Sequence, residues 1–344
     1  MRTIFIIFLT GCLMKGFAQV PMDLAMLQTG QPTSIRGLSV VDDDVAWVSG
    51  SDGWIGRTTD HGLTWHWEQI AGYEAFDFRD IEAFSAEEAV AINAGAPLVI
   101  LRTSDGGRTW RETYRDGRPA IFFDGIDFWD DRRGIAYGDP IDGVLQLLVT
   151  DDGGVSWRDV STVANLRPEE GEAGFAASGT GIRTWGDDTV FIASGGTRAR
   201  LFYSVDGGMT WAVNDCPMVQ GTASTGIFSI AFRDEMHGVA VGGDYQHDKE
   251  KDGVVFLTAD GGKTWAAPQR GTNGFRSAVE YVGRDTLIAT GTSGVDVSFD
   301  GGQHWHAVSG NSFHAVRKAK HGSWVVLAGG DGHIATITGM DEKD

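Results

Sequence analysis

The chain has little cysteine, little proline and few basic residues for its 344 positions. It has only two cysteines and eight prolines, so disulfides cannot be what holds it together. Its 28 basic residues against 47 acidic ones give a formal charge of −19. Because polyanions are bound by clustered Lys and Arg, we expect no nucleic-acid or anionic-lipid partner. A hydrophobic content of 42% nevertheless predicts a globular chain with a large core.

Two kinds of chemical motif are also missing. The sequence has no dinucleotide-binding fingerprint, and Gly-rich tracts such as Asp152-Gly-Gly are typical of hairpin turns. The histidines are scattered along the chain and are not spaced as metal ligands. We therefore expect neither a cofactor nor a bound metal, and a redox enzyme is the least favoured class of function.

The N-terminus carries a short apolar run, residues 4–9, which is too short to span a membrane as a helix. It is typical of the central region of a secretory signal, so residues 1–18 are predicted to be a signal peptide cleaved after Ala18. Leu9-Thr10-Gly11-Cys12 resembles a bacterial lipobox, and lipidation of Cys12 is the alternative. We expect export to the periplasm or beyond, with an outer-membrane lipoprotein as the alternative.

Six copies of one octapeptide recur along the chain, each reading Ser/Thr, any residue, Asp, any residue, Gly, any residue, Thr/Ser/His, Trp. The copies end 45, 47, 54, 54 and 40 residues apart. A period near 40 to 50 with fixed turn chemistry predicts one four-stranded sheet per repeat, arranged radially as a β-propeller. The final residues are Trp65, Trp110, Trp157, Trp211, Trp265 and Trp305.

Each residue type in the octapeptide has a physical role. The Asp accepts hydrogen bonds from nearby backbone N–H groups, the Gly permits a positive φ, and the Trp buries a large ring. The aspartates are Asp60, Asp105, Asp152, Asp206, Asp260 and Asp300. Calcium binding or acid catalysis is the alternative interpretation, but six equivalent sites around a ring suit structural repetition better than one active centre.

The octapeptide resembles the Asp-box, or BNR repeat, of sialidases, some endoglucanases, sortilin-type receptors and photosystem II assembly factor-like propellers. The resemblance covers almost the whole chain, with six of seven expected copies. It implies a propeller, and similarity to the assembly factor-like group implies a binding or assembly function without requiring photosynthesis.

The last repeat unit is incomplete. It offers three strands, 314–316, 324–328 and 332–337, and has no octapeptide. We predict that residues 23–29 supply the missing fourth strand and close the ring, since closure removes exposed sheet edges. Residues 19–344 are therefore expected to form one all-β, seven-bladed propeller.

The repeat register separates two faces. The octapeptide turns share one face, and the long, irregular loops share the other, which we expect to carry function. At the axis on that loop-rich face the register predicts a polar ring suited to an anion, because Arg offers a bidentate fork. The alternative is a structural lining of a water-filled channel. The candidate ligand-binding residues at this mouth are Arg36, Arg79, Asp124, Arg276 and His314.

Three classes of function follow. A non-enzymatic propeller that binds a protein, a glycan or a small anion is favoured. A glycoside hydrolase is the alternative, and it needs two carboxylates facing one another across a cleft. Asp124, Asp139 and Asp244 are the candidates on the loop-rich face, but a sialidase would also need a Phe/Tyr-Arg-Ile-Pro motif, where residues 33–38 read Thr-Ser-Ile-Arg-Gly-Leu.

Overall fold

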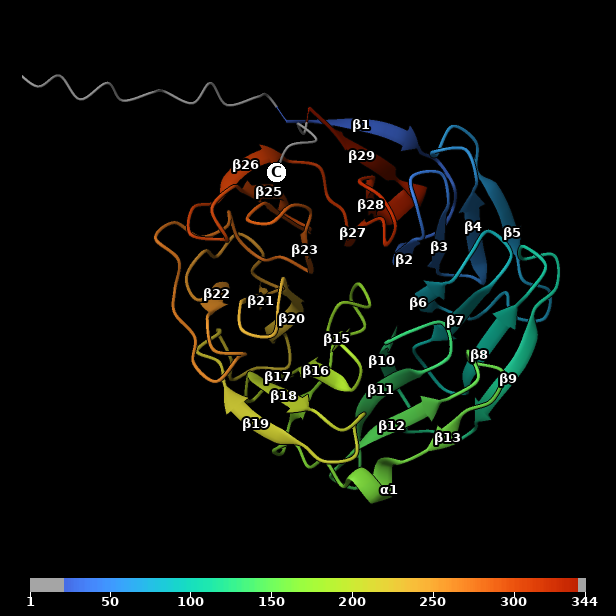
Figure 1. The fold of residues 1–344 in the computed structure, drawn as a ribbon, viewed down its shortest axis with the longest axis horizontal. Helices are drawn as coiled ribbons and strands as arrows, with labels where there is room; N and C mark the ends of the chain where they lie inside the picture. The colour runs from blue at the N-terminus through green and yellow to red at the C-terminus, as the bar shows by residue number, and fades with distance from the viewer. Residues whose placement is uncertain (1–21, 340–344) are drawn as a thin grey trace, which may run out of the picture.

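The computed structural model describes residues 22–339, which form seven sheets arranged radially about a single axis (Figure 1). The predicted signal peptide, its cleavage after Ala18 and the lipidation site Cys12 lie outside the described residues. Within them, no helix is long and apolar enough to cross a membrane. The expected all-β, seven-bladed propeller is confirmed.

The first four blades are antiparallel sheets of four strands. From the axis outward, the first blade contains β2 (Ile35–Val40), β3 (Ala46–Gly50), β4 (Trp54–Thr58) and β5 (His66–Gln69), and the second contains β6 (Phe78–Ala83), β7 (Ala89–Asn93), β8 (Leu98–Thr103) and β9 (Arg111–Asp116). The third blade contains β10 (Phe123–Phe128), β11 (Gly134–Ile141), β12 (Val144–Thr150) and β13 (Arg158–Asp159). The fourth contains β15 (Ile182–Trp185), β16 (Thr189–Ala193), β18 (Arg200–Ser204) and β19 (Ala212–Asp215). A one-turn helix, α1 (Ser161–Ala164), follows the third blade.

The other three blades follow the same plan. The fifth blade contains β20 (Thr225–Phe232), β21 (Gly238–Asp244) and β22 (Val255–Thr258). The sixth contains β23 (Ala278–Tyr281), β24 (Leu287–Gly291), β25 (Gly294–Ser298) and β26 (His306–Ser309). The seventh contains β27 (Ala315–Lys318), β28 (Val325–Ala328), β29 (Ile334–Thr338) and β1 (Asp23–Gln28), with a 3-10 turn η1 (Gly330–Gly332). In the fifth blade a single bridge, Leu257–Ala266, replaces the outer strand, and β14 (Glu172–Ala173) and β17 (Gly195–Gly196) extend the sheet beside β20.

The ring closes as predicted. β1 pairs antiparallel with β29, from Asp23 opposite Thr338 to Gln28 opposite Ile334. In Figure 1 the blue first strand lies beside the red last one at the top of the ring. The described residues thus begin and end in one blade, and the outer edge of β29 is covered.

All six octapeptide turns share one hydrogen-bond pattern. The hydroxyl of the first residue donates to Asp Oδ1, and the backbone N–H of the seventh donates to the same oxygen; in the first copy these distances are 2.8 Å from Thr58 and 2.9 Å from Thr64 to Asp60. The Thr64 hydroxyl donates to Oδ2 at 2.6 Å, and the Gly62 N–H donates to the Thr58 hydroxyl at 3.0 Å. Since each carboxylate is occupied within its own turn, the pattern supports a structural role.

The hydrophobic core lies between neighbouring blades. Inner strands are buried along nearly their whole length, whereas outer strands such as β9 are largely exposed or half-buried. The octapeptide tryptophans cover this core from its edge: Trp110 meets Trp47 edge-on, with ring centroids 6.2 Å apart. The expectation of a fully buried ring holds for Trp305, which is 2% exposed. The other five rings are half-buried.

This difference predicts a graded effect of removing the ring. Trp305→Ala is expected to lower the free energy of unfolding by about 3–5 kcal/mol, because a fully buried indole leaves a cavity among Val239, Leu257 and their neighbours. Trp157→Ala should have a smaller effect, since that ring is half-buried. Urea unfolding of both variants measures the two values, and equal losses would contradict the packing described.

Candidate functional site

Two of the predicted arginines do lie together at the axis on the loop-rich face. An Arg36 Nη1 donates to the Ala177 carbonyl at 3.3 Å, and an Arg79 Nη1 lies 3.5 Å from the Ala176 carbonyl. Arg79 also pairs with Asp77 at 2.7 Å. Burial, followed by the positive charge of Arg79, lowers the pKa of Arg36.

His314 joins these arginines. Its Nδ1 contacts the Ile35 carbonyl at 2.9 Å. Burial and then the charge of Arg36 lower the pKa of the imidazole to about 4, so His314 is neutral at pH ~7 and adds no positive charge there. Anion binding by this group stays a prediction.

The mouth that these residues line is filled by the chain itself. Residues 174–181, which we call the plug segment, cross the axis before β15 begins. The Ser178 hydroxyl donates to the Ser277 carbonyl of the sixth blade at 2.8 Å. On the fifth blade, the Thr180 hydroxyl donates to Ser229 at 2.6 Å, and Phe175 stacks on Phe228 with ring centroids 3.7 Å apart. The axial channel is therefore closed at its loop-rich end.

The carboxylates predicted on this face lie in two places. Asp124 is 2% exposed beneath the plug segment, and Asp139 beside it accepts the Gly174 N–H at 3.1 Å. Asp244 lies elsewhere, at the end of β21, with Oδ2 2.8 Å from His247 Nδ1. Asp124 and Asp139 thus lie under the plug segment and not across an open cleft.

Arg276 does not join the other arginines. Its side chain is 1% exposed, and its Nε donates to Asp296 Oδ2 at 2.9 Å. A second guanidinium nitrogen donates to the Ser293 hydroxyl at 2.6 Å. The prediction that Arg276 lines the mouth is therefore wrong: the residue forms a buried ion pair with the third strand of its own blade.

The reason is a register difference of one residue. Leu38 pairs with Val48 in the first blade, and the equivalent pair in the sixth blade is Val279 with Ala289. The sequence repeats, aligned on their octapeptides, match Ala278 with Leu38 instead. Because side chains alternate along a strand, this slip moves Arg276 to the opposite side of the strand.

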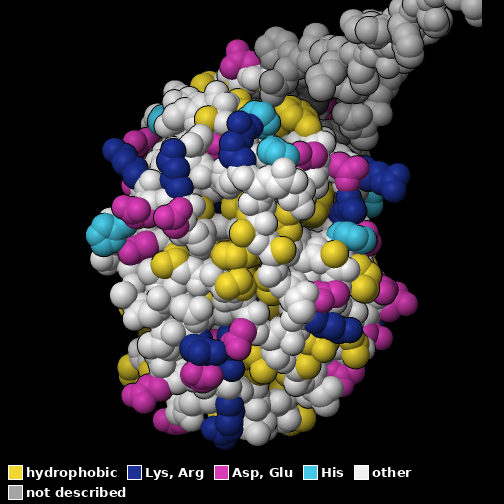
Figure 2. Space-filling view, turned by 90° about the vertical axis from the view of Figure 1, so that its left-hand side faces the viewer, with side chains coloured by type: hydrophobic (Ala, Val, Ile, Leu, Met, Phe, Trp, Pro, Cys, Tyr) yellow, Lys and Arg dark blue, Asp and Glu magenta, His cyan; other side chains and the backbone are white. Residues whose placement is uncertain are grey.

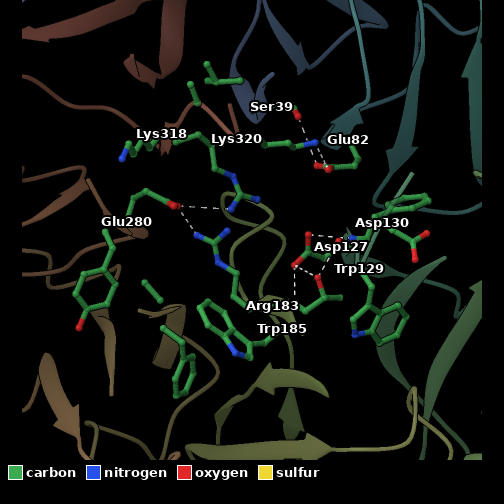
Figure 3. Close-up of a pocket in the computed structure, with 18 of the residues that line it drawn as sticks. Ser39, Glu82, Asp127, Trp129, Asp130, Arg183, Trp185, Glu280, Lys318 and Lys320 are labelled. Carbon is green, nitrogen blue, oxygen red and sulfur yellow. Dashed lines mark hydrogen bonds and ion pairs between the residues drawn. The ribbon is translucent and has the colours of Figure 1, made fainter. Parts of the chain in front are cut away.

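A second mouth opens on the octapeptide face. There, a cavity of about 470 Å³ lies on the axis, and all seven blades contribute to its wall (Figure 3). We call it the axial cavity. The inner strand of every blade contributes to this lining, and the contributions include Ser39, Glu82, Asp127, Arg183, Ala231, Glu280 and Arg317.

Ion pairs join opposite parts of this wall. Arg183 donates to Glu280 at 2.5 Å, and Arg317 lies 3.8 Å from the same carboxylate. Lys320 pairs with Glu82 and donates to a backbone carbonyl at 2.6 Å. Figure 3 shows Arg183 directed toward Glu280, and Lys320 directed toward Glu82. The wall thus combines both signs of charge.

Asp127 is the exception, because it has no ion-pair partner within 4.0 Å among the described residues. Its Oδ2 accepts the Thr184 N–H at 2.7 Å and the Thr184 hydroxyl at 3.2 Å, and its Oδ1 accepts the Phe128 N–H at 3.0 Å. Burial raises its pKa, although Arg183 opposes the increase. Protonation of this carboxyl is therefore easier than that of an exposed aspartate.

The neighbouring acidic groups respond to burial as Asp127 does. Burial also raises the pKa of Glu82 and of Glu280, against the effects of Lys320 and Arg183 respectively. For Arg183 burial acts to lower the pKa, but Glu280 and Asp127 outweigh it and raise the value. The arginine therefore stays charged while the acids become easier to protonate.

The rim of the axial cavity is divided by charge. Residues 317–321, Arg-Lys-Ala-Lys-His, line the side of the seventh blade, and Asp130 and Asp131 line the side of the third. Trp129, beside Asp130, and Trp185 of the fourth blade add aromatic surface to the lining (Figure 3). Lys318 is half-buried and forms no ion pair with any described residue.

A sequence signal for this cavity existed. In each blade, one lining residue directly follows a buried apolar residue of the inner strand: Glu82 follows Ile81, and Asp127 follows Ile126. Alternation along a strand sends such residues to the opposite side, toward the axis. Charged residues in the middle of inner strands were the signal.

The outer wall of the ring differs from the axial cavity. Figure 2 shows acidic, basic and hydrophobic side chains interspersed over the side of the molecule that it presents. Among residues 22–339, no group of three or more His, Cys, Asp and Glu side chains is arranged to hold a metal ion.

Comparisons with known proteins show the fold. No protein-family model and no curated protein matches the chain. The structure of YCF48 bound to D1 peptide matches with a TM-score of 0.66 and 15% identity, covering 93% of this chain and 96% of that one. YCF48 from Cyanidioschyzon merolae matches with a TM-score of 0.63 and 16% identity over 91% of this chain and 98% of that one.

An enzyme structure is similar as well. The GH74 xyloglucanase from Xanthomonas campestris matches with a TM-score of 0.62 and 15% identity, covering 92% of this chain and 53% of that one. Propellers with different activities thus share this architecture. At these identities the likeness shows the seven-bladed propeller fold.

Proposed function

We propose that this chain is an exported, non-enzymatic propeller of the Asp-box type that binds an acidic segment of a protein partner in its axial cavity. The observation that carries the proposal is the cavity itself, walled by all seven blades and bordered by the basic segment 317–321. Pockets formed by a rigid scaffold are the usual place for binding. The plug segment closes the other mouth, so we place the site on the octapeptide face.

The charge at the rim supports an acidic segment. Lys318 offers an ammonium group that forms no ion pair with a described residue. The guanidinium of Arg317 forms one long ion pair, at 3.8 Å, with the Glu280 carboxylate. Most of the surrounding protein is negative, with a formal charge of −19. An isolated positive sector of this kind attracts an anionic group locally. A solved propeller of similar fold is bound to a peptide, which agrees with a peptide ligand.

The cavity favours binding over hydrolysis. Two of its interior carboxylates, Glu82 and Glu280, form ion pairs, and Asp127 accepts three hydrogen bonds. Of the three carboxyls considered for a glycoside hydrolase, Asp124 and Asp139 lie under the plug segment, and Asp244 lies apart from them at the end of β21. A glycosidase needs an acid and a second carboxylate that are both exposed to the sugar. Neither the carboxyls of the axial cavity nor those under the plug segment meet that need.

Charge reversal at the rim tests the proposal. Peptides are selected from a random display library on the full chain, and their affinities are measured by calorimetry. Lys318→Glu should weaken acidic peptides about tenfold, which is ~1.4 kcal/mol. Lys263→Glu is the matched control, because Lys263 is exposed in the octapeptide turn of the fifth blade, on the same face and outside the cavity. Equal losses in both variants, or none in either, would refute the site.

A further inference from the structure

The plug segment rests on a buried acidic group that the proposed binding site does not use. Asp124 Oδ1 and Oδ2 and the Tyr137 hydroxyl are buried, and none of the three has a hydrogen-bond partner among the described residues. Asp139 borders them, with Oδ1 accepting the Gly174 N–H at 3.1 Å. Two carboxyls therefore meet where the plug segment enters the axis.

The packing at this point leaves little space. A Cβ added to Gly174 would lie 2.4 Å from Asp124 Oδ2 and 2.9 Å from the Tyr137 ring. A Cβ on Gly181, at the other end of the plug segment, would lie 2.4 Å from the Tyr137 hydroxyl oxygen. Glycine is thus required at both positions, and the plug segment is seated directly on the acidic group.

The charges around the group are few. Arg79 and Asp80 face it from β6, and Tyr137 and Asp139 face it from β11. Asp80 itself is engaged, because its oxygens accept the Ile81 and Ile126 N–H groups at 2.9 Å each. Arg183, on β15, acts on Asp80. The plug segment reads Gly-Phe-Ala-Ala-Ser-Gly-Thr-Gly and contributes no acidic or basic side chain.

We propose that Asp124 and Asp139 act as a pH-sensitive latch: the pair in its protonated, neutral form holds the plug segment in the axial channel, and ionisation of the pair releases it. This device is independent of the proposed binding function. Two adjacent carboxylates cannot both be ionised in a buried site without strong repulsion, and Arg79, the cation that faces them, forms its ion pair with Asp77. Moving the plug segment admits water to the pair and relieves that repulsion.

The direction of the pH effect follows from the shifts. Burial, and then the negative charge of Asp139, hold the pKa of Asp124 well above its ordinary value. Burial raises the pKa of Asp139 to about 6. A raised folded-state pKa contributes stability that is complete below the ordinary carboxyl pKa and is lost as the pH rises through the folded value. The plug segment is therefore held most firmly below the ordinary carboxyl pKa, and it is released as the pH rises through the folded value of about 6.

Hydrogen exchange of residues 174–181 tests the latch. Exchange is measured at pH ~5 and pH ~8, on either side of the raised pKa of Asp139, and each rate is divided by the intrinsic rate at that pH. In the unmodified chain, protection should fall by at least about tenfold toward pH ~8. The increase of about two units in the pKa of Asp139 corresponds to a factor of ~100 in the equilibrium between the held and the released plug segment. The double variant Asp124→Asn and Asp139→Asn should lose this pH dependence.

The matched control is Asp142→Asn. Asp142 is exposed in the β11–β12 turn of the same blade and has a φ of 53°, which Asn accepts. It should keep the full pH dependence. An equal pH dependence in the double variant and the unmodified chain would overturn the latch. Should the double variant fail to fold, carboxyl-carbon NMR titration of the unmodified chain decides: both carboxyls titrating near ~4 would also overturn it.

Discussion

A chain that begins at residue 30 is expected to unfold or aggregate, because it lacks the strand that completes the seventh blade. Removing β1 exposes the outer edge of β29, from Ile334 to Thr338. It also removes Leu24 and Leu27, which pack against two separate core clusters. An unpaired, apolar strand edge promotes pairing with other chains. Thermal melting and size-exclusion chromatography measure the result.

The control for this truncation is a chain that begins at residue 22, where the described structure begins. It should melt as the longer chain does, since β1 is intact. Unchanged melting of the shorter form would show that β1 is dispensable and that the blade is stable with three strands.

Arg276→Gln is expected to lower the free energy of unfolding by about 3–5 kcal/mol, because it leaves the Asp296 carboxylate buried without its cation. The neutral amide cannot replace the charge, although Asn273 still donates to Asp296 at 3.0 Å through its backbone N–H. Urea unfolding provides the value.

Arg36→Gln and Arg79→Gln form the comparison. Both side chains are partly exposed, and their bonds to the plug segment are long, at 3.3 and 3.5 Å. Each substitution should change stability by no more than about 1 kcal/mol. If all three variants were equally stable, the buried ion pair of Arg276 would have no special role.

The fold was predictable because one short motif recurs. Each octapeptide specifies its turn through local hydrogen bonds, as between Thr58, Asp60 and Thr64, so no long-range information is needed to recognise it. The period then gives the size of each blade. The closing strand 23–28 was predictable for a different reason, since an incomplete last blade requires a partner for its edge.

The candidate site was less predictable. The plug segment has no periodic pattern, and its path across the axis depends on contacts with blades far away in sequence, such as that between Ser178 and Ser277. Arg276 was misplaced because one residue of register changes the side of a strand. Arg36, Arg79 and His314 were placed together correctly, but no sequence pattern indicates that the chain itself fills their mouth.

The closing strand pair also determines how the ring responds to mechanical force. Asp23 and Thr338 lie opposite one another at the same end of an antiparallel pair. Tension applied between the two ends of the described chain would therefore load the β1–β29 hydrogen bonds one after another, as in a zipper, and not all at once in shear. The β1–β29 pair, which closes the ring and stabilises it against thermal unfolding, is thus the first part to separate when the two ends are pulled apart.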